Sequence, residues 1–539
     1  MRRLTLSLAI SLSLLAGCKQ GAQAPNAAVE APAAAAATAA FAYEEASVAS
    51  LQQQMGSGGL TSRALTQAYL DRIAAIDDAG PTLNAVIETN PDALKEADAL
   101  DAERKAGKLR GPLHGIPVLL KDNIDATPMV NSAGSLALAE HRPKTDAFLV
   151  AKLRAAGAVI LGKTNLSEWA NIRSTRSTSG WSARGGQVKN PYALDRNPCG
   201  SSGGTGSAIA ANLAAVGIGT ETDGSIICPS AVAGLVGIKP TVGLVSRSGI
   251  IPISHSQDTA GPMARSVSDA AALLTAIAAA DPADAATSEY TARAAIDYTT
   301  HLKPDALKGA RIGVLRKAMG YQPDVDAAFE RAVAALKAAG ATVVDAEIPT
   351  AGQWGEAELE VLLYELKADL NAYLISSGAP VKSLAEVIAF NKQNAATEMR
   401  FFAQELFEQA EAKGPLTDKA YIDARDKARR LAGPEGIDVA LNKDNLDALI
   451  APSMSPAWPT DPINGDHFTG AGYGAAAVAR YPSVTVPSGH SHGLPLGITF
   501  MGTAWSEARL VELAYAYEQA SKARTPPKFL PTVDFSAKK

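Results

Sequence analysis

Two kinds of hydrophobic pattern alternate along most of the chain after about residue 42. Stretches with apolar residues every three or four positions, such as 62–76 and 93–106, predict amphipathic helices. Short continuous apolar runs, such as 116–120 and 159–163, predict strands that are buried on both faces. This alternation predicts an α/β domain whose sheet is covered by helices on both faces.

The segment 281–440 has a different pattern, because long amphipathic stretches dominate it. Beside short strands at 312–315 and 342–344, helices are expected at 356–375, 384–390, 397–411 and 418–431. We interpret this segment as a mainly helical insertion over one side of the sheet, which shapes the pocket. Core strands return at 446–452, so the whole domain is placed at 42–530.

The first 41 residues do not have the pattern of a folded domain. Residues 1–18 combine two arginines, a short apolar run and Leu-Ala-Gly-Cys, which resembles a bacterial lipobox with Cys18 as the lipidated residue. Residues 19–41 are rich in Ala and Pro and predict a flexible linker. We expect a lipid-anchored protein on the periplasmic side of a bacterial envelope. The alternative is an ordinary cleaved signal and a secreted or soluble periplasmic protein.

The composition of the chain limits which classes of partner are expected. The 539 residues are 47% hydrophobic and 19% charged, as in globular proteins, with a net charge of −5 and only 5% aromatic residues. Neither a basic surface nor an aromatic platform for bases is indicated, so nucleic acid is not an expected partner. Besides Cys18, the chain has Cys199 and Cys228, which we interpret as buried free thiols that pair only if the fold brings them together.

The run from Cys199 to Thr241 is the densest in small and hydroxyl residues. Two Ser- and Gly-rich turns, 199–207 and 219–226, flank the apolar segment 208–216, which is expected to form a buried helix. Small residues allow sharp turns and close approach of a substrate. Successive N–H groups in such turns bind anions, so this run predicts a site that stabilises a developing negative charge.

Two nucleophilic arrangements fit these turns. Gly200–Gly204 matches the G-x-S-x-G pattern with Ser202 at its centre, but Asn197 and Pro198 oppose the strand that must precede such an elbow. The other arrangement takes Lys121 as the base, because it ends the buried strand 116–120. Desolvation there lowers the pKa of a lysine from its usual value of about 10.4. His490-Ser491-His492 is interpreted as a loop rather than a metal site.

Three segments together resemble the amidase signature family: 115–125, 162–168 and 200–241. The resemblance extends from about residue 45 to 525, and 180–187 with 219–225 look like the bacterial peptide amidases within that family. It implies the amidase signature fold, with a mixed central sheet covered by helices on both faces and a helical insertion.

The resemblance also implies a Ser–Ser–Lys triad. Ser225 matches the nucleophile, Ser201 the bridging serine that follows a cis peptide bond, and Lys121 the base. The oxyanion hole would be formed by the backbone N–H groups of Thr222, Asp223, Gly224 and Ser225. No metal and no cofactor is implied.

The expected reaction is hydrolysis of carboxamides to carboxylate and ammonia, with C-terminal amides of peptides as the best candidate substrates. The alternatives are an aryl-acylamidase or esterase of the same fold, and a non-catalytic binding lipoprotein. Ile227-Cys228 replaces a pair that commonly contains Arg, which argues against a component of a glutamine-hydrolysing amidotransferase. No obligate protein partner is expected, and the membrane is contacted only through the lipid.

Overall fold

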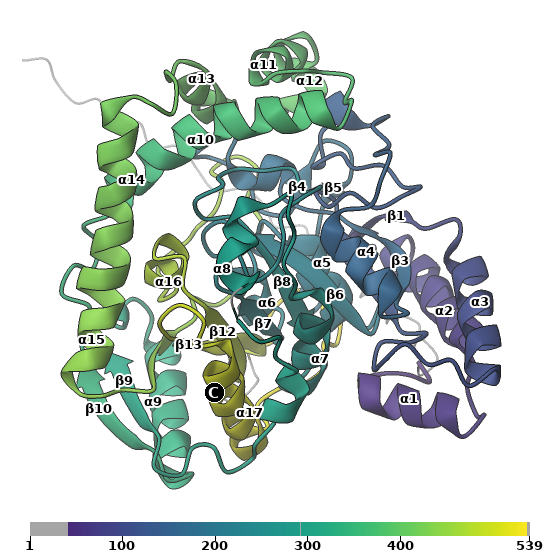
Figure 1. Ribbon diagram of the computed structural model, residues 1–539, viewed down its shortest axis with the longest axis horizontal. Helices are drawn as coiled ribbons and strands as arrows, with labels where there is room; N and C mark the ends of the chain where they lie inside the picture. The colour runs from purple at the N-terminus through teal and green to yellow at the C-terminus, as the bar shows by residue number, and fades with distance from the viewer. Residues whose placement is uncertain (1–40, 292, 536–539) are drawn as a thin grey trace, which may run out of the picture. The chain divides into compact units, whose positions relative to one another are not determined.

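The structure is a computed structural model that describes residues 41–291 and 293–535. The signal segment 1–18, its Cys18 and residues 19–40 of the linker lie outside the described residues. Within the described part, eleven strands form one mixed sheet in the order β1-β3-β2-β6-β8-β7-β12-β13-β11-β9-β10 (Figure 1). Its pairs are parallel in β3-β2-β6 and β11-β9-β10 and antiparallel elsewhere. The predicted α/β fold with a mixed central sheet is confirmed.

The strands of this sheet are short and mostly buried. Their bounds are β1 Val86–Thr89, β2 Pro117–Lys121, β3 Val159–Thr164, β6 Val216–Glu221, β7 Val236–Lys239, β8 Thr259–Ala264, β9 Arg311–Leu315, β10 Thr342–Ala346, β11 Ala448–Pro452, β12 Ser483–Ser491 and β13 Leu494–Met501. A separate hairpin consists of β4 Trp181–Ser182 and β5 Gly186–Gln187.

The helices range from one turn to six. They are α1 Val48–Gly56, α2 Ser62–Arg72, α3 Ala93–Lys105, α4 Phe148–Ala155, α5 Gly203–Ala210, α6 Ile227–Val232, α7 Val267–Ile277, α8 Ser288–Thr291, α9 Pro323–Ala338, α10 Gly355–Ser376, α11 Leu384–Gln393, α12 Ala395–Glu398, α13 Glu405–Glu411, α14 Lys419–Ala432, α15 Asp438–Lys443, α16 Gly474–Val478 and α17 Glu507–Ser521. Single turns of π- or 3₁₀-helix lie at Ile73–Asp77, Leu136–Leu138, Glu168–Asn171, Ala285–Thr287, Tyr298–His301, Arg316–Ala318 and Gly433–Ile437.

Helices cover both faces of the sheet. The helices α5 and α6 pack on one face of the central strands, and α7, α9 and α17 form a layer on the other. Figure 1 shows α7 and α17 of this second layer in the lower centre of the view. The core between the layers is almost entirely aliphatic and alanine-rich. Close contact of backbones through small side chains explains why so Ala-rich a chain packs well.

The long helix α10 lies over the loops beside the sheet rather than over the sheet itself. Its residues Leu363, Leu366 and Leu370 form a separate apolar cluster with Trp169 and Ile253. The helices α11 and α13 complete this cluster, and α14 packs against α10 on another side. Part of the segment 281–440 is thereby held above the loops that follow β3 and precede β8, while its strands β9 and β10 extend the sheet at one edge.

The apolar segment 208–216 is not one helix, as the sequence suggested. The helix α5 begins at Gly203, inside the first Gly-rich turn, and ends at Ala210. The apolar run then turns at 211–215 and continues as β6. Continuous burial explains the error, because a fully buried helix and a fully buried strand have the same apolar pattern.

The expected helix 397–411 is also interrupted. Two shorter helices replace it: α12 ends at Glu398, and α13 begins at Glu405. Between them Phe402 packs against the ring of Trp181, with centroids 5.3 Å apart, and against the guanidinium of Arg173 at 4.3 Å. These tertiary contacts outweigh the local helical preference.

Among the described residues, none of the helices is both long and apolar enough for a bilayer crossing.

Candidate active site

Lys121 ends β2 and carries its amine into the interior. The residues before it are apolar and fully buried, so the strand runs through the core and the lysine cannot reach solvent. Its Nζ lies 2.7 Å from Oγ of Ser201 and 2.9 Å from Oγ1 of Thr220. Burial lowers the pKa of Lys121 to about 7, although Asp258 and Glu221 favour the charged form. A large fraction of this amine is therefore uncharged at neutral pH.

Ser201 stands where the loop from Cys199 enters α5. The Gly200–Ser201 peptide bond is cis, as the resemblance implied. Ser201 is completely buried, with Lys121 on one side and the cavity-lining Gly200 on the other. The neighbouring Ser202 instead donates its hydroxyl proton to the carbonyl of Thr220 at 3.1 Å. Since no strand precedes Ser202, the nucleophile-elbow interpretation has no support in this fold.

Ser225 lies on the turn between β6 and α6. Gly224 before it has φ of 79°, and a Cβ there would come within 2.5 Å of the Tyr473 ring, so only glycine fits. The Ser202 N–H donates to the Ser225 carbonyl at 3.3 Å, which ties the two Ser-rich turns together. Ser225 is 9% exposed, and this exposure opens into a cavity.

The carboxylate of Glu221 stabilises the turn that carries Ser225 through hydrogen bonds to its backbone. Its Oε2 accepts the N–H groups of Ile226 at 2.7 Å and Ile227 at 2.9 Å. Burial raises the pKa of Glu221, while Lys239 and nearby N–H groups, including that of Gly224, oppose the rise. Within the described residues, no acceptor lies in hydrogen-bond range of the N–H groups of Thr222, Asp223 and Ser225. These three donors are available to a ligand.

The cavity at Ser225 has a volume of about 280 Å³. Its walls combine backbone and polar groups on one side with apolar and aromatic side chains on the other. They are formed by Ala170, Asn171, Ile172, Ser179, Cys199, Gly200, Thr222, Asp223, Ser225, Ile253, Leu362, Trp458, Asp466, Phe468 and Tyr473. Leu362 comes from α10, so the segment 281–440 contributes directly to the wall.

Two carboxyl groups face each other beside this cavity. Burial raises the pKa of Asp223 well above its usual value, and repulsion from Glu358 raises it further. Burial also raises the pKa of Glu358, a residue of α10 whose Oε1 accepts from the amide of Gln257 at 3.0 Å. Burial and mutual repulsion therefore both disfavour a state in which the two carboxyl groups are charged together.

Cys199 and Cys228 form a disulfide, with Cα atoms 6.1 Å apart. The interpretation as two free thiols is therefore wrong. The pairing was not visible in the sequence because 29 residues separate the two cysteines. Only the packing of α5 against α6 brings the start of one Ser-rich turn beside the end of the other. The bond thus joins the segments that carry Ser201 and Ser225.

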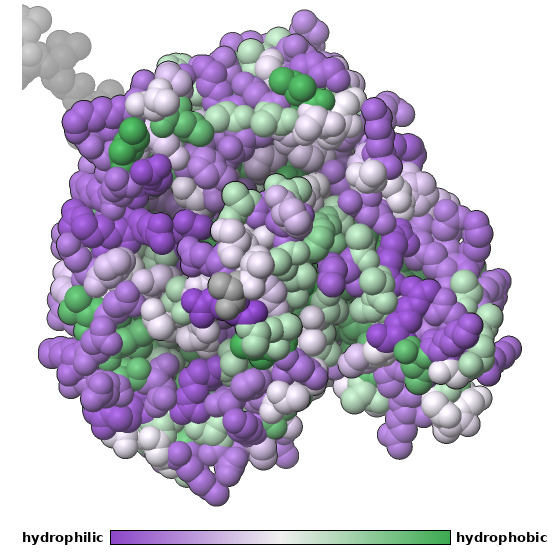
Figure 2. Space-filling view, in the orientation of Figure 1, coloured by the Kyte–Doolittle hydropathy of each residue, from purple (hydrophilic) through white to green (hydrophobic). Residues whose placement is uncertain are grey.

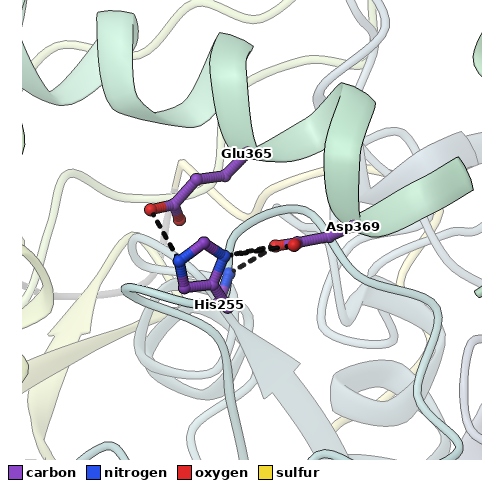
Figure 3. A group of neighbouring side chains, drawn as sticks. All are labelled: His255, Glu365 and Asp369. Carbon is purple, nitrogen blue, oxygen red and sulfur yellow. Dashed lines mark hydrogen bonds and ion pairs between the residues drawn. The ribbon is translucent and has the colours of Figure 1, made fainter. Parts of the chain in front are cut away.

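One group of side chains in the described part has the spacing of metal ligands: His255, Glu365 and Asp369, whose donor atoms lie within 4.8 Å of one another (Figure 3). These atoms already have protein partners. Glu365 accepts the hydroxyl of Tyr421 at 2.6 Å and the N–H of Ser256 at 2.9 Å. Figure 3 shows the imidazole held between the two carboxylates of α10. Burial opposes its charge, but Asp369 raises the pKa of His255. The group is an ion-paired link between α10 and the loop before β8.

The expected loop at His490 is a strand, because His490 and Ser491 belong to β12. Nε2 of His490 lies 2.9 Å from Oγ1 of Thr525, and His492 lies near Asp324. These two rings do not converge on a common point in the described structure.

Thr220 and Glu221 contact the candidate triad or its turn, although sequence reasoning did not single them out. Both end β6, a strand that was not predicted, and both act through geometry rather than through a recognisable motif. Thr220 contacts Lys121 and accepts from the Asn123 amide at 3.0 Å, while Glu221 orders the turn of Ser225. The only sequence feature that could have pointed to these two residues is their position within the Ser- and Gly-rich run 219–226.

Comparisons with known proteins place the chain among the amidases. The family model described as Amidase matches residues 64–511. A probable amidase of Arabidopsis thaliana is 41% identical over 504 residues, which cover 91% of this chain and 93% of that protein. A putative amidase of Arthroderma benhamiae is 39% identical over 502 residues, covering 88% of this chain and 81% of that protein. The native peptide amidase of Stenotrophomonas maltophilia superimposes with a TM-score of 0.88 at 60% identity, covering 91% of this chain and 100% of that one.

Proposed function

This chain belongs to the amidase signature family, and from that premise we propose that it hydrolyses carboxamides to carboxylate and ammonia through Ser225, Ser201 and Lys121. The observation that carries the proposal is the 2.7 Å contact between the desolvated amine of Lys121 and the hydroxyl of Ser201. It lies directly behind the cavity that Ser225 lines. A buried amine of low pKa next to a hydroxyl is the arrangement that activates a weak nucleophile.

Acylation begins with Lys121 uncharged. Its lone pair takes the proton of Ser201 as Ser201 takes the proton of Ser225, and Oγ of Ser225 forms a bond to the amide carbon. The carbonyl electron pair moves onto oxygen. The N–H groups of Thr222, Asp223 and Ser225 surround this oxygen, whereas the fourth expected donor, the N–H of Gly224, is directed to the Glu221 carboxylate. Those of Thr222, Asp223 and Ser225 lack a protein acceptor among the described residues, so they are free to stabilise the charge.

Collapse of this intermediate breaks the C–N bond. The leaving nitrogen takes the proton back from Lys121 through Ser201 and departs as ammonia, leaving an acyl ester on Ser225. Water then gives a proton along the same path and attacks the ester carbon. The second collapse releases the carboxylic acid and returns the proton to Ser225, which restores the starting state.

C-terminal amides of peptides are the proposed substrates. The 60% identity to a peptide amidase supports this choice, as do the apolar walls formed by Ile172, Leu362 and Phe468, which suit a side chain next to the scissile amide. An aryl-acylamidase or esterase of the same fold is the rival within the family. Faster turnover of aryl amides or esters than of peptide amides would favour that rival.

The test is release of ammonia from peptide amides, acyl amides and aryl amides, with esters followed by acid release. Ser225→Ala should lower kcat by about 10⁴-fold or more, because the nucleophile is removed. Ser207→Ala is the matched control, since this serine of α5 donates its hydroxyl to the carbonyl of Lys189 and contacts none of the three residues of the proposed triad. Wild-type rates in Ser225→Ala would assign the nucleophile elsewhere. Absence of labelling by a fluorophosphonate probe would favour a non-catalytic binding lipoprotein.

We also propose that the enzyme works outside the cytoplasm, on the periplasmic side of a bacterial envelope and anchored through a lipid on Cys18. The disulfide between Cys199 and Cys228 supports this placement, because disulfides persist in oxidising compartments. The proposal needs no protein partner, metal or cofactor.

A further inference from the structure

A second cavity, of about 610 Å³, lies on the side of α10 away from Ser225. Neighbouring residues of that helix separate the two spaces, since Leu362 lines the Ser225 cavity and Val361 the larger one. In Figure 1 the surrounding elements are α8, α14 and α16, and in Figure 2 the surface over α14 is strongly hydrophilic while that over α8 and α16 is mixed. The volume is within the usual range for small-molecule sites. The proposed amidase chemistry does not use this space.

The lining of this second cavity is dominated by arginine. Arg247, Arg425, Arg429 and Arg480 face two carboxylates, Glu289 and Asp426; the remaining lining residues are His255, Ser256, Gln257, Ala285, Ala286, Ser288, Val361, Ala428 and Val478. The imidazole of His255 is not available to a ligand, because Glu365 and Asp369 hold it (Figure 3). The arginines therefore determine what this space can bind.

Two of the four guanidinium groups are paired within the protein. Arg247 forms a 2.6 Å ion pair with Asp284, and Arg425 a 2.8 Å ion pair with Asp426. The other two, Arg429 and Arg480, have no hydrogen-bond or ion-pair partner among the described residues. The space thus contains two cations without a hydrogen-bonded partner, and the carboxylate of Glu289 in the same wall offsets only part of their charge.

Arg480 is the more informative of the two. It follows α16 in a left-handed backbone conformation, with φ of 68°, and its side chain is half-buried. Burial lowers the pKa of Arg480, and the nearby charges of Arg429 and Arg247 lower it further, although Glu289 and Glu365 attract the cation. Holding a desolvated cation next to other cations is unfavourable unless an anion joins them. Guanidinium groups bind phosphate and carboxylate through paired N–H donors, and two unpaired ones match a dianion.

We propose that this cavity is a binding site for a phosphate or phosphate monoester, held by Arg480 and Arg429. The phosphate lies between the two guanidinium groups, and the rest of the volume accommodates the organic part of a monoester. Gln257 lies in the wall of this cavity, and its amide donates to the carbonyl of Thr222 at 3.3 Å. A bound phosphate would therefore be connected through one side chain to the turn that carries Ser225.

The test is titration calorimetry of the mature protein with inorganic phosphate and with glycerol 3-phosphate, at constant ionic strength. Saturable one-to-one binding is expected, and Arg480→Gln should weaken it by about tenfold or more. Arg430→Gln is the matched control, because Arg430 neighbours Arg429 on α14 but is paired with Glu435 and exposed. Absence of saturable binding in the millimolar range, or equal affinity in Arg480→Gln, would overturn the proposal. Tighter binding of the monoester would identify an organic phosphate as the ligand. Equal affinity for the two compounds would identify inorganic phosphate.

Thermal unfolding provides an independent measurement. Without phosphate, Arg480→Gln should be at least as stable as the wild type, because burial and repulsion by Arg429 and Arg247 outweigh the attraction by Glu289 and Glu365 that the substitution also removes. With phosphate, only the wild type and Arg430→Gln should gain stability. A less stable Arg480→Gln protein that still gains stability with phosphate would show that Arg480 has only a structural role. Ser225→Ala should bind phosphate normally, which separates this proposal from the proposed amidase activity.

Discussion

At the scale of the residue, burial decides which chemistry Lys121 can perform. A solvated lysine is fully protonated at neutral pH, whereas burial at the end of β2 brings the pKa of Lys121 to about 7. The same burial leaves hydroxyl groups as its nearest polar neighbours, those of Ser201 and Thr220. A base of this kind needs no imidazole, and its contact with the bridging hydroxyl is already formed in this structure.

The pH dependence of kcat/KM should report this group. Only the uncharged amine can accept a proton, so kcat/KM should rise tenfold per pH unit below about 7 and level off above it. The measurement is kcat/KM for a peptide amide from about pH 5 to 9, which would show this rise and the plateau above it. Lys121→Ala should lower kcat by about 10³-fold or more, and kcat/KM of the variant should no longer change with pH near 7. A flat profile through pH 7 in the wild type would contradict the assignment of Lys121 as base.

Glu221 illustrates a residue whose role is positional. It holds the N–H groups of Ile226 and Ile227, so Glu221→Ala would leave two buried donors without an acceptor. We expect a loss of roughly 2–4 kcal/mol in the free energy of unfolding, measured by urea denaturation. Glu221→Gln keeps an acceptor oxygen and should lose less. Equal losses in the two variants would assign the effect to the charge opposite Lys239 rather than to the hydrogen bonds.

At the scale of the element, the site depends on the pair α5 and α6. The two helices lie on the same face of the sheet, and each begins beside a Ser-rich turn. The Cys199–Cys228 disulfide and the Ser202 N–H bond to Ser225 both cross between these segments. The relative position of Ser201 and Ser225 is therefore fixed by a covalent bond as well as by packing.

Removing the disulfide should destabilise the protein. Closing a loop over a separation of 29 residues stabilises a fold by about 3–4 kcal/mol in the chain-entropy model. Cys228→Ser and Cys199→Ser should each lower the unfolding free energy by about that amount, and the double variant should lose no more than either single one. A wild-type protein whose melting temperature does not change when the bond is reduced would contradict this expectation.

At the scale of the whole molecule, the segment 1–41 is expected to determine where the protein works. A lipid on Cys18 and the linker 19–41 would hold the domain near a membrane. In a bacterial expression host, the wild type should sediment with the membrane fraction, and Cys18→Ser should move the activity to the soluble fraction. Thiol titration of the unfolded domain should find Cys199 and Cys228 oxidised in both. A soluble wild type whose signal has been removed near Ala16 would favour the ordinary cleaved signal.

The sequence alone reached the α/β class and most helix and strand positions, and its resemblance to a known family supplied the candidate triad. Period and length of the apolar runs defined β2, β3 and α10 to within a residue or so, because these elements are either clearly amphipathic or short and flanked by turn residues. It failed where a longer apolar run contains no Gly or Pro that marks a boundary. The run 208–216 divides between a helix, a turn and a strand, and no periodicity distinguishes these in an all-apolar segment.

Tertiary structure alone decided what those residues meet. The pairing of Cys199 with Cys228, the contact of Thr220 with Lys121 and the arginine-lined cavity all join positions far apart in the chain. Local patterns encode which face of an element is apolar, and this determines secondary structure. Distances between side chains follow only when the elements pack, because they depend on where β2, β6, α5 and α14 lie relative to one another.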